Sequence, residues 1–177
     1  MKRAVFFDRD GTLIYDKEYM YKTEDLEIIN GVAETLATLK KRGYALFILS
    51  NQSGVPRGYF TLEQAEQFNE HFIELLGLGK DIFDGVCLAI DPPDSTNGYR
   101  KPSPKYIVEQ SKKYGFDEKN VWVVGDRRSD WQTAVNAGCN AIAVKTGKPI
   151  EHKDIEFIAE HNIRLVDKIH DALKILP

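Results

Sequence analysis

Two aspartates near the start of the chain have the spacing and setting of a phosphoryl-transfer site. An apolar run over residues 4–7 leads directly into Asp8 and Asp10, and Gly11 follows them. Residues two apart on an extended segment project to the same side, and a hard divalent cation prefers oxygen ligands. The pair can therefore share one cation, and one carboxylate can attack phosphorus. Gly11 would let the chain turn sharply beneath the phosphate.

Further polar residues follow other apolar runs along the chain. Ser50 and Asn51 come directly after a second apolar run, Lys101 precedes a proline, and Asp126 and Asp130 follow a third run. In an open parallel sheet, the carboxyl ends of the strands line a crevice. We therefore expect these side chains to meet the two aspartates at one edge of a sheet.

Strand-like and helix-like patterns alternate through the chain. Strands are predicted over 4–7, 44–49, 83–90, 121–124, 141–144 and 163–166, and helices over 32–42, 62–75, 104–114, 129–136 and 169–176. This alternation predicts the α/β class, with a three-layer, Rossmann-like, mostly parallel sheet and helices on both faces. We expect a single domain over residues 1–177. The intervals between Asp8, Ser50 and Lys101 are filled by these elements, so we expect no separate cap domain.

Composition disfavours several classes of partner. The net charge is −3 and the charges are mixed along the chain, which gives no general basic field for nucleic acid. No apolar stretch approaches the roughly 20 residues of a membrane span, and the chain opens on a strand without the features of a signal peptide. We expect a cytoplasmic protein, a monomer or a weak dimer, without a membrane partner. Cys87 and Cys139 have apolar or small neighbours, which favours two buried free thiols.

Four short segments resemble the motifs of the haloacid dehalogenase superfamily of phosphohydrolases. They are Asp8-Arg9-Asp10-Gly11-Thr12, the strand-terminal Ser50-Asn51, Lys101 before a proline, and Gly125-Asp126 followed by Asp130. Segments 18–21, 51–58, 100–102 and 146–147 more narrowly resemble the branch of D,D-heptose 1,7-bisphosphate phosphatases and histidinol phosphatases.

The resemblance implies a catalytic role for four residues. Asp8 would be the nucleophile that forms an aspartyl-phosphate. Asp10 would protonate the leaving oxygen and later deprotonate the attacking water. Ser50 would donate a hydrogen bond to a phosphoryl oxygen, and Lys101 would offset the phosphate charge while it holds the nucleophile ionised.

The resemblance also implies Mg²⁺ as the cofactor. Its ligands would be Asp8, Asp126 and the backbone carbonyl of Asp10. Three residues would support these ligands: Asp130, Gly11 and Thr12. Asp130 would hold a metal-bound water or orient Lys101. Relatives in the narrower branch commonly carry a structural zinc before the Arg-Lys-Pro segment, but residues 91–99 contain no cysteine or histidine, so we expect no zinc.

Substrate contacts are expected from four residues: Asn51, Arg57, Arg100 and Tyr19. Arg57 could bind a second phosphate or a sugar hydroxyl through its forked guanidinium, or it could be an ordinary surface charge. We call residues 15–26 the flap. Without a cap, specificity should depend on residues 15–21 of the flap and on the 91–99 loop.

Each motif also has a plainer interpretation. An Asp-x-Asp-Gly segment can be a simple turn, Ser50 can cap the next segment, and Lys101 can be a solvated lysine. An EF-hand is excluded because Gly11 stands fourth from Asp8, where that loop needs glycine at the sixth position. Joint occurrence of all the motifs at strand ends favours catalysis.

The sequence therefore predicts a Mg²⁺-dependent phosphomonoester hydrolase that acts on a small phosphorylated metabolite. A sugar bisphosphate such as D-glycero-D-manno-heptose 1,7-bisphosphate is the first candidate, with histidinol phosphate and polynucleotide 3′-phosphate as alternatives. A phosphoacceptor or binding domain without turnover is an alternative from a different class. Asp10 speaks against it, because a carboxylic acid at that position assists water attack.

Overall fold

A six-stranded sheet in the order β3-β2-β1-β4-β5-β6 organises the computed structural model, which describes residues 2–177. The strands are β1 (Arg3–Phe7), β2 (Tyr44–Asn51), β3 (Gly85–Ala89), β4 (Val121–Gly125), β5 (Asn140–Val144) and β6 (Arg164–Val166). Every pair of neighbouring strands is parallel. The predicted α/β class and Rossmann-like sheet are confirmed, and the order is that of a doubly wound fold.

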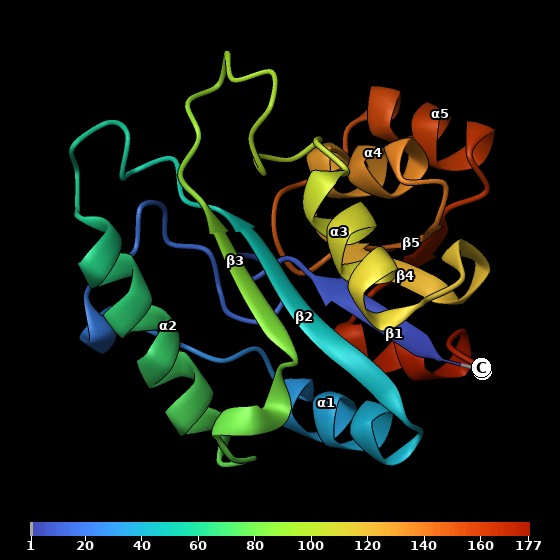
Figure 1. Cartoon of the computed structure of the whole chain (residues 1–177), viewed down its shortest axis with the longest axis horizontal. Coiled ribbons are helices and arrows are strands. Elements are labelled where there is room, and N and C mark those ends of the chain that lie inside the picture. The colour runs from blue at the N-terminus through green and yellow to red at the C-terminus, as the bar shows by residue number, and fades with distance from the viewer. Residues whose placement is uncertain (1) are drawn as a thin grey trace.

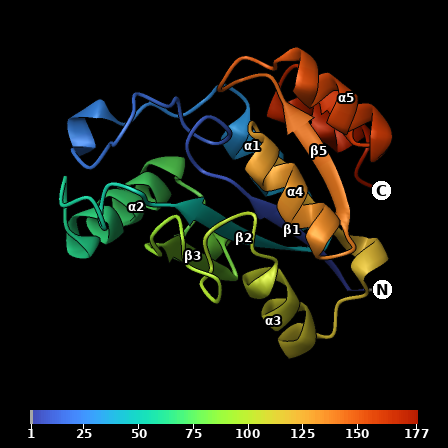
Figure 2. The same ribbon diagram turned by 90° about the horizontal axis from the view of Figure 1, so that it is seen from above.

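Helices cover both faces of the sheet. They are α1 (Val32–Lys41), α2 (Leu62–Leu76), α3 (Lys105–Tyr114), α4 (Arg128–Asn136) and α5 (His152–Glu160), with 3₁₀ turns at Thr23–Asp25, Lys80–Ile82, Glu118–Asn120 and Ile169–Lys174. Figure 1 shows α2 and α3 on opposite sides of β2 and β3, and the view from above in Figure 2 agrees. The three-layer prediction is therefore confirmed.

The side chains of β1 point alternately to the two faces of the sheet, and each face packs against its own apolar cluster. Val5 and Phe7 face one apolar cluster, which includes side chains of α1 and α2, while Ala4 and Phe6 face a second cluster with side chains of α3, α4 and α5. All four side chains are fully buried. A strand buried on both faces reads as a continuous apolar run, which is why sequence alone located β1.

Helix boundaries follow local signals where those are strong. The side chain of Thr61 accepts a hydrogen bond from the amide of Gln64, and the Gln64 side chain accepts one from the amide of Thr61. This capping box fixes the start of α2. Gly77 ends the helix in the left-handed conformation, which glycine adopts without a steric penalty.

The C-terminal third differs from the sequence prediction. Helix α5 was not predicted, because only Asp154, Phe157 and Ile158 are buried in it and so short an apolar face gives a weak helical period. The segment predicted as a helix over 169–176 forms a 3₁₀ helix over Ile169–Lys174 instead. In residues 2–177, no helix is both long and apolar enough to cross a bilayer.

Candidate active site

The carboxyl ends of the central strands bring the predicted site residues to one edge of the sheet. Strand β1 lies between β2 and β4, and the amide of Asp8 continues the ladder by donating to the carbonyl of Val124 at 2.9 Å. Ser50 is the second-last residue of the neighbouring strand β2, and Asp126 follows β4. Figure 1 shows the arrowheads of β1, β2 and β3 directed toward the same end of the molecule.

A buried ion cluster occupies this edge. The ammonium of Lys101 lies 2.6 Å from Oδ1 of Asp8 and 2.6 Å from Oδ1 of Asp130. The exposed fractions of these three side chains are 3%, 8% and 1%, respectively. A buried lysine between two carboxylates is a costly arrangement unless all charges are paired. Its presence here therefore indicates that function, rather than stability, requires these charges.

Burial and neighbouring charges shift the pKa values in this cluster. Burial raises the pKa of Asp8 well above its usual value; Lys101 counteracts this, and Asp130 and Asp126 add to it. Burial, followed by the charge of Asp130, raises the pKa of Asp126 to about 6. Burial alone would lower the pKa of Lys101, but the two carboxylates beside it raise that pKa above its ordinary value. Lys101 therefore stays charged.

Three carboxylates offer a site for a divalent cation. Oxygen atoms of Asp8, Asp126 and Asp130 lie within 4.8 Å of one another, and all three residues are buried. Oδ1 of Asp126 is a buried oxygen without a hydrogen-bond partner in the described chain. With all three carboxylates ionised, this group and the Lys101 ammonium carry a net charge of −2, which a divalent cation would neutralise. These residues therefore fit Mg²⁺.

The acidic group differs from the predicted ligand set in one respect. Asp130, expected only to support the ligands, lies within this group of three carboxylates and also contacts Lys101. The side chain of Asp10 lies outside it, which leaves the backbone carbonyl as that residue's predicted means of binding the metal.

Two glycines fit closely around Asp126. A methyl group at Gly11 would lie 2.5 Å from Oδ2 of Asp126, and one at Gly147 would lie 1.9 Å from the same atom. Gly11 also has a φ of +91°, which few side chains tolerate. The amide of Lys148 donates to this oxygen at 2.9 Å, and the Thr146 hydroxyl donates to the carbonyl of Gly11 at 2.7 Å. The segment after β5 therefore packs against the Asp126 side chain and hydrogen-bonds to it.

Asp10 is held by a residue that the sequence analysis did not single out. Arg9 is fully buried and donates to Oδ1 of Asp10 at 2.9 Å and to Oδ2 at 3.2 Å. Gln52 donates to Asp10 at 3.2 Å and to the hydroxyl of Ser50 at 2.8 Å. Burial raises the pKa of Asp10, but the charge and hydrogen bonds of Arg9 outweigh it, so the net shift is downward. The guanidinium also lies 4.9 Å from the ring centre of Phe68.

Two other predicted site residues are Asn51, whose side chain binds the backbone of Lys101, and Thr12, which is buried. The side chain of Asn51 accepts from the amide of Lys101 at 2.9 Å and donates to its carbonyl at 3.2 Å. These bonds fix the backbone of Lys101. Asn51 also lines the cavity, so the predicted substrate contact stays a prediction. Thr12 is fully buried, and its hydroxyl has no partner within residues 2–177.

A cavity of about 340 Å³ opens above the carboxylates. Four basic side chains line it in addition to Lys101: Arg57, Arg100, Arg127 and Lys148. Arg127 donates to Asp16 of the flap, and Lys148 donates to Glu18 of the flap at 3.0 Å. Arg100 donates to the Ser53 hydroxyl at 2.7 Å. Five carboxylates line the same cavity: Asp8, Asp10, Asp16, Glu18 and Asp130. Its suitability for anions therefore depends on Arg57 and Arg100, which form no ion pair with a carboxylate within residues 2–177.

The flap contributes Tyr19 to the cavity rim. Arg57 donates to the Tyr19 hydroxyl, and the Tyr19 ring packs edge-on against Tyr59 with 4.8 Å between ring centres. Glu18 and Tyr19 both have positive φ values, 60° and 48°, which are uncommon for residues other than glycine. In contrast to the prediction, no residue of the 91–99 loop lines the cavity; Arg100, directly after the loop, does.

Comparisons with known proteins agree with this chemistry. A family model described as haloacid dehalogenase-like hydrolase matches residues 14–144. The chain is similar to the D-glycero-beta-D-manno-heptose-1,7-bisphosphate 7-phosphatase of Photorhabdus laumondii, with 36% identity over 83% of this chain and 82% of that protein. The protein of the same name from Haemophilus influenzae is 32% identical, over 99% of this chain and 97% of that one.

Solved structures share the fold. A crystal structure of D,D-heptose 1,7-bisphosphate phosphatase from B. bronchiseptica, complexed with magnesium and phosphate, matches with a TM-score of 0.84. The match covers 99% of this chain and 98% of that chain at 24% identity. A putative phosphatase from Mesorhizobium loti matches with a TM-score of 0.70 at 27% identity, over 85% of this chain and 76% of that one.

Proposed function

The chain belongs to the haloacid dehalogenase-like hydrolases, and we propose that it is a Mg²⁺-dependent phosphatase that removes one phosphate from a small sugar bisphosphate. The observation that carries this proposal is the buried Asp8–Lys101–Asp130 cluster beside Asp126, at the base of a cavity lined by basic side chains. D-glycero-D-manno-heptose 1,7-bisphosphate is the first candidate substrate, because the similar proteins from several bacteria carry that activity in their names.

Asp8 is the proposed nucleophile. Lys101 binds its Oδ1, which leaves Oδ2 to form the bond to phosphorus while the bond from phosphorus to the leaving oxygen breaks. The product of this step is an aspartyl-phosphate, which divides one difficult displacement into two easier ones. Mg²⁺ bound by the three carboxylates would offset the negative charge on the phosphoryl group.

Asp10 is the proposed general acid and base. It gives a proton to the leaving oxygen in the first step and takes one from the attacking water in the second, which releases inorganic phosphate and restores Asp8. Arg9 and Gln52 favour the ionised form before substrate binds. An approaching phosphate dianion favours the protonated form instead, so substrate itself prepares Asp10 to act as an acid.

Basic residues at the cavity rim would bind the second phosphate of a bisphosphate substrate. Ser50 would donate to the phosphoryl group under attack. Arg57 and Arg100 also line the cavity, and neither of them forms an ion pair with a carboxylate among the described residues, so both charges are available to an anion. Together with Tyr19 and Asn51 they would contact the rest of the substrate. A bisphosphate uses both sets of charges, whereas histidinol phosphate and p-nitrophenyl phosphate use only one.

A phosphate-release assay tests the proposal. Purified protein with Mg²⁺ is given the heptose bisphosphate, histidinol phosphate and an oligonucleotide 3′-phosphate, with Asp8→Asn as the inactive control. We expect the bisphosphate to give the highest kcat/KM, and activity to disappear with EDTA. Release from none of the three by the wild-type protein would contradict the proposed hydrolysis. A persistent phosphorylated protein in intact mass spectra, without turnover, would instead support a phosphoacceptor.

A further inference from the structure

The loop between β3 and α3 is closed by a single carboxylate. Oδ2 of Asp91 accepts hydrogen bonds from the amides of Tyr99 at 2.8 Å and Arg100 at 3.2 Å. Gly98 lies so close that a methyl group there would stand 2.1 Å from Oδ1 of Asp91. The two ends of the 91–99 loop are therefore joined by side-chain to backbone bonds, and hydrogen bonds to an ionised acceptor are the stronger kind.

The amides bound by Asp91 belong to the segment that carries two cations of the active site. Arg100 extends into the cavity and donates to Ser53 at 2.7 Å. The next amide, that of Lys101, donates to Asn51 at 2.9 Å. Two side chains from the ends of neighbouring strands thus fix three successive amides, and with them the direction in which Arg100 leaves the backbone.

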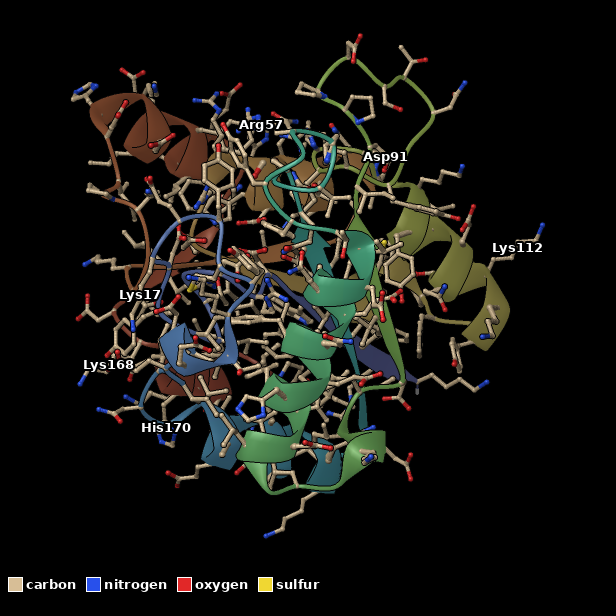
Figure 3. All side chains as sticks on the ribbon, turned by 90° about the vertical axis from the view of Figure 1, so that its left-hand side faces the viewer. Lys17, Arg57, Asp91, Lys112, Lys168 and His170 are labelled. Atoms are coloured by element: carbon tan, nitrogen blue, oxygen red, sulfur yellow. The ribbon has the colours of Figure 1, made fainter. Side chains whose placement is uncertain are left out.

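Asp91 does not itself face the substrate. It does not line the cavity, and its hydrogen bonds go to backbone amides rather than to the guanidinium of Arg100. The positive charge of Arg100 is therefore not cancelled by the carboxylate that holds its backbone. Figure 3 shows Asp91 at the base of its loop, at the same end of the molecule as Arg57.

We propose that Asp91 is a positioning residue that sets Arg100 to bind the second phosphate of the substrate. This inference rests on the proposed bisphosphate hydrolysis and extends it. It also gives a physical account of a loop that contains no cysteine or histidine, since a carboxylate that binds two amides organises the loop without a metal. A fixed arginine binds a phosphate more tightly than a mobile one, because less conformational freedom is lost on binding.

The test compares KM and kcat in matched loop variants. With Asp91→Ala, we expect KM for the bisphosphate to rise roughly ten- to hundredfold, the range typical of a misplaced binding group. p-Nitrophenyl phosphate lacks a second phosphate, so kcat measured with this substrate at saturation should change by a much smaller factor than KM for the bisphosphate. Asp91→Asn keeps an oxygen acceptor and should restore most of the affinity. Asp94→Ala removes an exposed carboxylate from the same loop and should leave both constants unchanged.

A double mutant decides whether Asp91 acts through Arg100. If it does, Asp91→Ala should have no further effect on KM in an Arg100→Ala background, because the effects of coupled residues are not additive. Additive effects would overturn the inference, as would an equal loss of activity on both substrates. Urea unfolding of each variant identifies a merely structural loss. If the wild-type protein releases no phosphate from the bisphosphate, the proposed function fails first; an active wild type with an unaffected Asp91→Ala refutes only the positioning role.

Discussion

Replacing Lys101 by methionine removes the cation from the centre of the buried carboxylates. The side chain keeps most of its apolar length, so the change is chiefly one of charge. Asp8 and Asp130 would each lose a partner at 2.6 Å, and the local charge would change from −2 to −3 once Asp126 is included. Because all three carboxylates are buried, water cannot replace the lost ammonium effectively.

Two effects of opposite direction follow from this change in charge. Without Mg²⁺, the free energy of unfolding should fall by about 3–5 kcal/mol, the usual cost of leaving a buried charge without its partner. The stabilisation gained on adding Mg²⁺ should be larger than in the wild type, because a more negative site attracts the cation more strongly. Activity should nevertheless fall roughly 100- to 1000-fold, as for loss of one fixed electrostatic donor.

Urea unfolding at pH 8 in EDTA and in Mg²⁺, combined with a phosphate-release assay, measures all three quantities. Lys112→Met is the matched control, since Lys112 is exposed on α3 and lies away from Arg57 and Asp91 in Figure 3. General damage to the fold would reduce both activity and the response to Mg²⁺. The reasoning would be wrong if Lys101→Met kept activity within threefold of the wild type, or if Mg²⁺ stabilised it less than the wild type.

Three further measurements, two of them on variants, test other parts of the structure. Gly147→Ala should weaken Mg²⁺ binding at least tenfold in titration calorimetry, since the new methyl group would displace Asp126. Burial raises the pKa of Cys87 and Cys139 to about 12 from 9.0, so at pH 8 their thiolate fraction falls roughly a thousandfold and Ellman's reagent should react slowly until urea unfolds the protein. Thr61→Ala removes the α2 cap and should cost about 1 kcal/mol in urea unfolding.

Sequence alone was most successful where local pattern and geometry coincide. The strand that ends at Phe7 is an uninterrupted apolar run, so its end and the position of Asp8 could both be predicted. The meeting of Asp8 with Lys101, 93 positions later, follows from the parallel sheet, because the carboxyl ends of its strands share an edge. No local pattern gives the distance between them, which depends on the conformation of the segment that follows the 91–99 loop.

The residues that the sequence did not reveal act through long or indirect contacts. Arg9 alternates with Asp8 and Asp10, but its long side chain returns to Asp10 while its guanidinium lies against Phe68. Asp91 resembles an ordinary loop aspartate until the fold brings the amide of Arg100 to it. In both cases, sequence patterns describe the direction of the Cβ atom, whereas function depends on where the end of the side chain lies.

Residues 2–177 contain no separate cap domain, which gives the flap a particular task. Its carboxylates at Asp16 and Glu18 pair with Arg127 and Lys148, two cations that line the cavity. The Lys148–Glu18 pair is exposed and contributes little to stability, so an entering phosphate can displace Glu18 at little cost. The side chain of Asp16 is only 9% exposed, so its pair with Arg127 is less open to exchange. The aromatic contact of Tyr21 with Phe60, 5.5 Å between ring centres, does not depend on charge. We therefore expect the flap to stay docked on the loop after β2 when Lys148 exchanges Glu18 for a phosphate, so that the positive charge of Lys148 becomes available only once the substrate has bound.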